Sequence, residues 1–159
     1  MKCLLILIIL MMTTHSLIAS ANDVGDLVHS RTSAQEECLA LNMYHEARQW
    51  PTMMAEQFAI SFVVMTRVES PRWKNNICDV IKEPFQFSWI INGKPLPVNW
   101  KNKQEIAAWK EAKKLAHLFL VLYDNNLIED FTGGADHYHA YYVNPSWTKK
   151  MKYLGRFNN

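Results

Sequence analysis

Apolar residues recur at helical spacing in three stretches of the chain, and each stretch predicts a helix. The first covers residues 34–48 and is preceded by Ser33, which with Glu36 has the S-x-x-E spacing of a capping box. The second, residues 53–68, is apolar nearly all round, as expected of a central buried helix. The third, residues 103–123, carries an apolar stripe opposite lysines and glutamates. These helices are expected to form the core.

The segments that link and follow these helices are rich in turn signals. Asn92-Gly93 is one of several between the second and third helices. After the third helix, Gly133 and Gly134 allow a backbone to approach a ligand closely. The run 136–143 then predicts a strand. One face of this strand would carry His137, His139 and Tyr141.

A short strip of alternating polar and aromatic residues lies between the second and third helices. Gln86 and Ser88 alternate there with Phe87 and Trp89. Such a strip suits a sugar, because sugar ring faces stack on aromatic rings while the hydroxyl groups bind amide and hydroxyl side chains. The alternative is a loop whose two aromatic residues lie in the core.

Residues 1–21 have the pattern of a secretory signal peptide. Lys2 is followed by an apolar run over residues 4–12, and the small residues of an A-x-A cleavage site end at Ala21. The apolar run is too short to cross a bilayer as a helix. We therefore expect residues 22–159 to form one exported domain without a membrane span, with an uncleaved signal anchor as the alternative.

Composition narrows the choice of partners. The formal net charge of the chain is +2, without a run of basic residues, which gives no case for a nucleic-acid partner. Cys38 and Cys78 are the two cysteines outside the expected signal. An even pair in an exported protein predicts a disulfide, and two buried free thiols are the alternative.

Glu46 is the best candidate for chemistry. Its neighbours on one side of the expected first helix are Leu39, Asn42 and Met43, because residues three and four apart lie together at 3.6 residues per turn. A carboxylate on a largely apolar stripe is disfavoured in its charged form. Its pKa rises, and it can hold a proton near neutral pH for a leaving group. The alternative is a solvated glutamate at the helix end.

Three histidines raise the question of a zinc site. His137 and His139 share a face of the expected strand, and His45 with Glu46 begins the zincin pattern H-E-x-x-H. The fifth position of that pattern is Gln49, so the histidine pair on which the motif depends is absent. We therefore expect no metal and no cofactor, and histidines that bind substrate or have a structural role.

Several segments, taken in order, resemble the SleB/CwlJ type of cell-wall hydrolase, known from spore-cortex-lytic enzymes. These segments are residues 38–48, 67–73, 77–80, 86–89 and 132–139. The resemblance implies a small, mainly helical α+β domain with a short β element and an active-site cleft like that of lysozyme and lytic transglycosylases. In that family the glutamate of the Y-x-E-A-R segment is catalytic, and this role carries over onto Glu46.

The implied activity is cleavage of the β-1,4 bond between N-acetylmuramic acid and N-acetylglucosamine in peptidoglycan glycan strands, by a monomer in the periplasm or outside the cell. Glu46 would protonate the glycosidic oxygen and then act as base toward the C6 hydroxyl, giving a 1,6-anhydro end. A hydrolytic glycosidase needs a second carboxylate, for which Glu56, Asp79 and Asp136 are the candidates. The residues expected to bind the sugar are Tyr44, Gln86, Ser88, Trp89, Gly133, Gly134, His137, Tyr138 and His139.

Two other functions remain open at this point. A zinc-dependent peptidoglycan peptidase or amidase would need His45, His137 and His139 to converge. A wall-binding module without catalytic activity would instead use aromatic stacking platforms, for which the candidates are Trp89, Tyr138 and Trp147.

Overall fold

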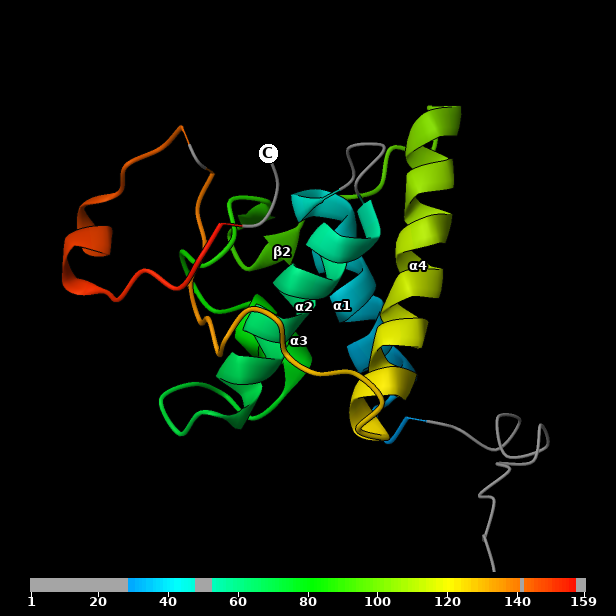
Figure 1. Ribbon diagram of the computed structural model, residues 1–159. Helices are drawn as coiled ribbons and strands as arrows, with labels where there is room; N and C mark the ends of the chain where they lie inside the picture. Colours follow the sequence, from blue (N-terminus) through cyan, green and yellow to red (C-terminus); the bar gives the residue numbers. More distant parts are fainter. Residues whose placement is uncertain (1–28, 48–52, 141, 157–159) are drawn as a thin grey trace, which may run out of the picture.

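The computed structural model describes residues 29–47, 53–140 and 142–156, which form a small, mainly helical α+β domain (Figure 1). The expected signal peptide, residues 1–21, lies outside the described residues. In chain order the elements are α1 (Ser33–Glu46), α2 (Met53–Glu69), α3 (Ile77–Ile81), β1 (Ile90–Ile91), β2 (Lys94–Pro95), α4 (Lys103–Asp124) and the 3-10 helix η2 (Ser146–Lys150).

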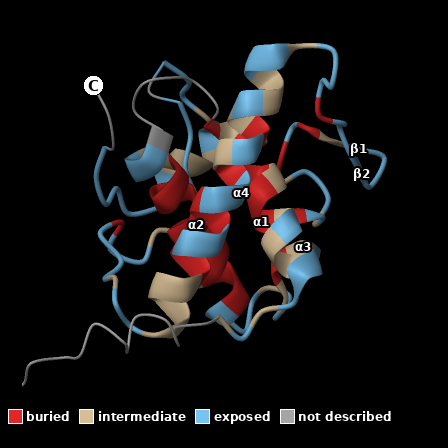
Figure 2. Cartoon of the chain, turned by 90° about the vertical axis from the view of Figure 1, so that its right-hand side faces the viewer, coloured by how far each residue is buried: buried red, intermediate tan, exposed pale blue. Residues whose placement is uncertain are grey.

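Helix α2 is the centre of the core, as predicted. Phe62, Val64 and Met65 on α2 are at most 2% exposed, and the ring of Phe62 packs edge-on against Phe119 of α4. Helix α1 contacts α2, α3 and α4, so buried residues gather where these helices face one another (Figure 2). No helix in the described part of the chain is long and apolar enough to span a membrane.

The start of α1 differs from the prediction by one residue. The N-cap is Thr32, whose hydroxyl oxygen accepts from the Gln35 amide at 3.3 Å. The predicted capping box of Ser33 and Glu36 is therefore wrong. The Glu36 carboxylate contacts two histidines instead of the helix start. At the other end α1 stops at Glu46, and Arg48, the expected last residue, lies outside the described residues.

A disulfide joins α1 to α3. Cys38 and Cys78 are bonded, with Cα atoms 5.3 Å apart, and they are 40 positions apart in sequence. The predicted disulfide is confirmed. The periodicity did not predict the short α3. Its N-cap is Asn76, whose side chain accepts from the amides of Cys78 and Asp79. It is held by the disulfide and by its buried residues Ile77, Val80 and Ile81.

The β element is a two-stranded hairpin in which Ile90 pairs with Pro95. Asn92 and Gly93 form its turn with φ of 50° and 73°, the left-handed pair that a tight hairpin requires. The strand predicted over 136–143 is wrong, because residues 136–140 run without a partner strand and Tyr142 lies in a turn. A side chain there supplies a hydrogen bond that a neighbouring strand would otherwise make, because Arg67 Nε donates to the Asp136 carbonyl at 2.7 Å.

Candidate active site

A cleft of about 300 Å³ lies where the ends of α1 and α2 meet the loop after α3 and the segment after α4. Figure 1 shows the segment after α4 returning across the bundle to the side of α2 and α3. Glu46 and Arg67 come from the two helices. The other lining residues are Gln86, Phe87, Ser88, Tyr138, His139, Ala140, Val143 and Pro145. The tertiary fold thus collects five of the residues predicted from sequence: Glu46, Gln86, Ser88, Tyr138 and His139.

The Glu46 carboxylate occupies this cleft at the last residue of α1. It is partly buried, and burial raises its pKa above the usual value of about 4.5. The hydroxyl of Tyr138, which donates to Oε2 at 3.0 Å, opposes the rise. The indole N–H of Trp89 opposes it too, although this group does not reach full hydrogen-bond geometry. The net direction is upward, which confirms the expectation from the apolar stripe.

Tyr138 is suited to remain a hydrogen-bond donor to Glu46. Although the residue as a whole is 37% exposed, its hydroxyl is buried. Burial and then the adjacent Glu46 carboxylate raise the pKa of Tyr138 well above its ordinary value. The phenol therefore keeps its proton near neutral pH, and its hydrogen bond favours the charged form of Glu46.

Arg67 lines the cleft and was not among the site residues predicted from sequence. It is 4% exposed, with its guanidinium 4.6 Å from the ring centre of Trp73 and 5.7 Å from that of Phe87. Burial lowers the pKa of Arg67. Its Nη1 has no hydrogen-bond partner among the described residues. The signal in the sequence was a charged residue near the end of an otherwise apolar helix.

The strip at 86–89 contributes to both the cleft and the core. Gln86, Phe87 and Ser88 line the cleft. Phe87 and Trp89 are 5% and 4% exposed and also belong to the core. Trp89 stacks on His45 with ring centres 4.6 Å apart and an interplanar angle of 14°. The buried Trp89 ring is therefore not available for stacking on a ligand, whereas the side chains of Gln86 and Ser88 line the cleft.

Tyr44 and the two glycines are placed away from the cleft lining. Tyr44 is 1% exposed, and its hydroxyl donates to Glu105 of α4 at 2.5 Å. Gly133 and Gly134 adopt φ of 68° and 78° in a turn where the Gly134 amide donates to the Asp130 carboxylate at 2.9 Å. Glycine adopts these positive φ angles without strain, and the turn leads the chain back toward the cleft.

The three histidines of the zinc alternative do not converge in the described structure. His139 lines the cleft, with Nδ1 2.9 Å from the Ala140 carbonyl oxygen. His137 faces Trp73 and Trp147, and its Nδ1 lies 2.9 Å from the Asp136 carboxylate. His45 Nε2 lies 3.0 Å from the carbonyl oxygen of Leu96. Within the described residues, a different set of potential ligands comes together: His29, Glu36 and His117.

The candidate second carboxylates are not among the described residues that line the cleft. Asp136 is closest to it in the chain, but it pairs with His137 and Arg72. Burial alone would raise the pKa of Asp136, yet these two hydrogen bonds hold it below its usual value. Asp136 is therefore a charged structural anchor, and Glu46 is the one carboxylate that the described part of the chain presents in the cleft.

A comparison with known protein families found a match. A family model described as Cell Wall Hydrolase matches residues 52–159, more than half of the chain. The matched part includes Arg67, the strip at 86–89 and the segment with Tyr138, whereas Glu46 precedes it. Comparisons with curated proteins and with solved structures found no match.

Proposed function

The chain belongs to the cell wall hydrolase family and is an enzyme that degrades peptidoglycan, and on this premise we propose that it cleaves the β-1,4 bond between N-acetylmuramic acid and N-acetylglucosamine. Glu46 is the general acid and base of this reaction. The observation that carries the proposal is a partly buried carboxylate, with its pKa raised, in a cleft lined by amide, hydroxyl and imidazole side chains.

In the first step Glu46 donates its proton to the glycosidic oxygen. The bond from that oxygen to C1 of the muramoyl residue breaks, and the oxygen leaves as a hydroxyl on the next sugar. Burial favours the neutral form of Glu46 before this transfer. Tyr138 donates to Oε2, which leaves Oε1 to carry the transferred proton, and the same bond stabilises the carboxylate once the proton has gone.

In the second step the Glu46 carboxylate takes the proton of the muramoyl C6 hydroxyl while O6 bonds to C1. The product is a 1,6-anhydro end, Glu46 is protonated again, and no water is consumed. Hydrolysis would need a second carboxylate to act as nucleophile or to activate water. Among the described residues that line the cleft, Glu46 is the only carboxylate, and this supports transglycosylation.

The remaining lining residues suit a sugar. Gln86, Ser88 and His139 offer hydrogen-bonding groups to hydroxyl and acetamido substituents, and Val143 and Pro145 add apolar surface. We assign the binding of the glycan strand to this set. The enzyme acts as a monomer outside the cytoplasm after removal of residues 1–21, a setting in which the disulfide between Cys38 and Cys78 is stable.

The test is the Glu46→Gln variant, assayed by mass spectrometry of the muropeptides released from peptidoglycan. Glutamine keeps the shape of glutamate but neither donates nor accepts the proton, and general acid and base catalysis is worth about 10²- to 10⁴-fold. We expect a loss at the upper end of that range, because one residue serves both steps. Anhydro ends in the wild-type products would identify transglycosylation, whereas reducing ends would identify hydrolysis.

A matched control is Glu129→Gln, the same substitution at an exposed glutamate outside the cleft lining. This variant should release muropeptides at the wild-type rate. If Glu46→Gln releases them within about tenfold of wild type, the assignment of Glu46 is wrong. Release of free peptides without glycan cleavage would instead identify a peptidase or amidase.

A further inference from the structure

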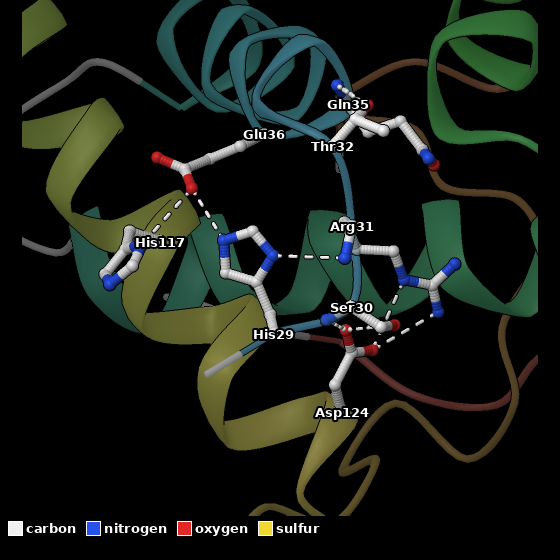
Figure 3. A network of polar contacts seen from close by, with 8 residues as sticks. All are labelled: His29, Ser30, Arg31, Thr32, Gln35, Glu36, His117 and Asp124. Carbon is white, nitrogen blue, oxygen red and sulfur yellow. Dashed lines mark hydrogen bonds and ion pairs between the residues drawn. The ribbon is translucent and has the colours of Figure 1, made fainter. Parts of the chain in front are cut away.

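Two histidines and a glutamate from three parts of the chain meet at the N-terminal end of α1 (Figure 3). Glu36 Oε2 lies 2.7 Å from Nε2 of His29, in the segment before α1, and 3.1 Å from Nδ1 of His117 on α4. The three ligand atoms all lie within 4.8 Å of one another. We propose that His29, Glu36 and His117 bind a divalent transition-metal ion, zinc first among them.

The donor set fits zinc by chemistry and by size. Two imidazoles and one carboxylate are typical zinc ligands, with bonds of about 2.0–2.2 Å, so ligand atoms of a tetrahedral site lie about 3.4 Å apart. The two contacts of Glu36, at 2.7 and 3.1 Å, need to lengthen by about 0.7 and 0.3 Å to reach that spacing. The His117 side chain is 59% exposed, so an ion and a fourth, water ligand can enter from solvent.

A second set of contacts holds the His29 segment in place without any ion. The amide and hydroxyl of Ser30 donate to Oδ2 of Asp124, and the guanidinium of Arg31 donates to Oδ1 (Figure 3). Asp124 and His117 are both on α4, seven positions and therefore about two turns apart. The contacts with Asp124 thus hold His29 beside the part of α4 that carries His117. The segment therefore loses less conformational entropy when the metal binds.

The proton on the His29 ring must move when the ion binds. The Arg31 amide donates a hydrogen bond to His29 Nδ1 at 3.2 Å. The ring proton is therefore on Nε2, which donates a hydrogen bond to Glu36. An ion bound at Nε2 takes the place of that proton, and the neutral ring then carries its proton on Nδ1. The Arg31 amide therefore loses its bond to His29 on loading, which gives the site a specific spectroscopic signature.

This site is separate from the cleft. Glu36 and Glu46 are ten positions apart on α1, a distance of about 15 Å along the helix axis. The ion would fasten the segment before α1 to α1 and α4, and it would have no part in the proton transfers of Glu46. Its function is structural, and its removal should loosen the N-terminal segment and leave the cleft chemistry in place.

The experiment is a titration of Zn²⁺ into the purified, chelator-stripped protein in competition with a chromogenic chelator, together with melting curves. The wild-type protein should bind one equivalent and melt at a higher temperature with zinc than without it. His117→Ala should weaken binding by about 100-fold or more and abolish the zinc-dependent rise. Glu36→Gln should act in the same direction. The Arg31 amide resonance should shift on zinc addition in the wild type and not in His117→Ala.

The matched control is His139→Ala, which removes a cleft histidine and should bind zinc as the wild type does. Substoichiometric binding, or equal affinity in wild type and His117→Ala, would overturn the proposal. Loss of binding in His139→Ala with retention in His117→Ala would also overturn it, because the ion would then lie in the cleft.

Discussion

The hydroxyl of Tyr138 donates a 3.0 Å hydrogen bond to Oε2 of Glu46 across 92 positions of sequence. This bond ties the segment after α4 to the end of α1, and both residues line the cleft. It acts on the chemistry as well as on the fold, because the hydrogen bond lowers the pKa of Glu46 while burial raises it. Tyr138 therefore tunes the proton affinity of the proposed general acid.

Tyr138→Phe removes the donor and keeps the ring. A hydrogen bond to a charged group contributes about 1.5–3 kcal/mol, so we expect kcat on peptidoglycan to fall by roughly 10- to 100-fold. The pKa of Glu46 should rise further, because the interaction that lowers it is gone. The measurement is kcat/KM against pH. A descending limb that stays in place would show that Tyr138 does not tune Glu46.

The pH dependence of the wild type follows from the same raised pKa. Because the proposed general acid must be protonated, kcat/KM should fall as pH rises through the pKa of Glu46, in a window above about 4.5. This descending limb should be seen with soluble glycan fragments, for which the charge of the insoluble wall has no influence. A rate that is flat across this window would contradict the role of Glu46.

The free energy of unfolding should also fall as pH rises through the pKa of Glu46. Since the folded pKa of Glu46 lies above the unfolded one, its contribution is fully present below about pH 4.5 and is lost as pH rises through the folded pKa. Compared with Glu46→Gln, the wild type should therefore lose free energy of unfolding over that window. Urea unfolding of both proteins at several pH values measures the difference. A difference that is independent of pH would mean that the carboxylate is solvated.

His139→Ala should lower turnover with little change in melting temperature. His139 is exposed and lines the cleft, and surface substitutions usually change stability by less than about 0.5 kcal/mol. His137→Ala is the matched comparison, since His137 contacts Asp136, Trp73 and Trp147 outside the cleft lining. It should lower the melting temperature more than His139→Ala does. Equal loss of turnover and stability in His139→Ala would make that histidine structural.

Removing the disulfide should destabilise the fold strongly. Cys38 and Cys78 are separated by 40 positions, and in the chain-entropy description closing such a loop stabilises by about 4 kcal/mol. The double variant Cys38→Ala/Cys78→Ala should lose roughly this amount in urea unfolding. Thiol titration of the unfolded, unreduced protein without residues 1–21 is the accompanying check, and two reactive thiols would contradict the bond.

The helices show which parts of the fold hydrophobic periodicity can predict. The predicted stretches 53–68 and 103–123 became α2, Met53–Glu69, and α4, Lys103–Asp124, because a continuous apolar face is a property of local sequence that the core then buries. The helix start was missed by one residue, since Thr32 and Ser33 are both suitable caps. In the structure Thr32 accepts from the Gln35 amide, and the Glu36 carboxylate contacts His29 and His117.

The strand predicted over 136–143 failed for a different reason. Alternation along one segment says which side chains would share a face, but a strand also needs a neighbour that accepts and donates backbone hydrogen bonds. The fold supplies the side chain of Arg67 there instead. The hairpin at β1 and β2 formed because Asn92 and Gly93 adopt the left-handed conformations that its turn requires.

The sequence by itself determined the three long helices and the turn at Asn92-Gly93, because each depends on residue type and short-range spacing. Residue type alone also singled out the cysteine pair, and short-range spacing made Glu46 the candidate for chemistry. Only the tertiary structure decided which side chains share the cleft. It set Tyr138 against Glu46, brought in Arg67, and left Tyr44 and the Gly133-Gly134 turn outside the cleft lining. The physical reason is that burial and hydrogen-bond geometry depend on contacts between segments far apart in the chain, which no local pattern contains.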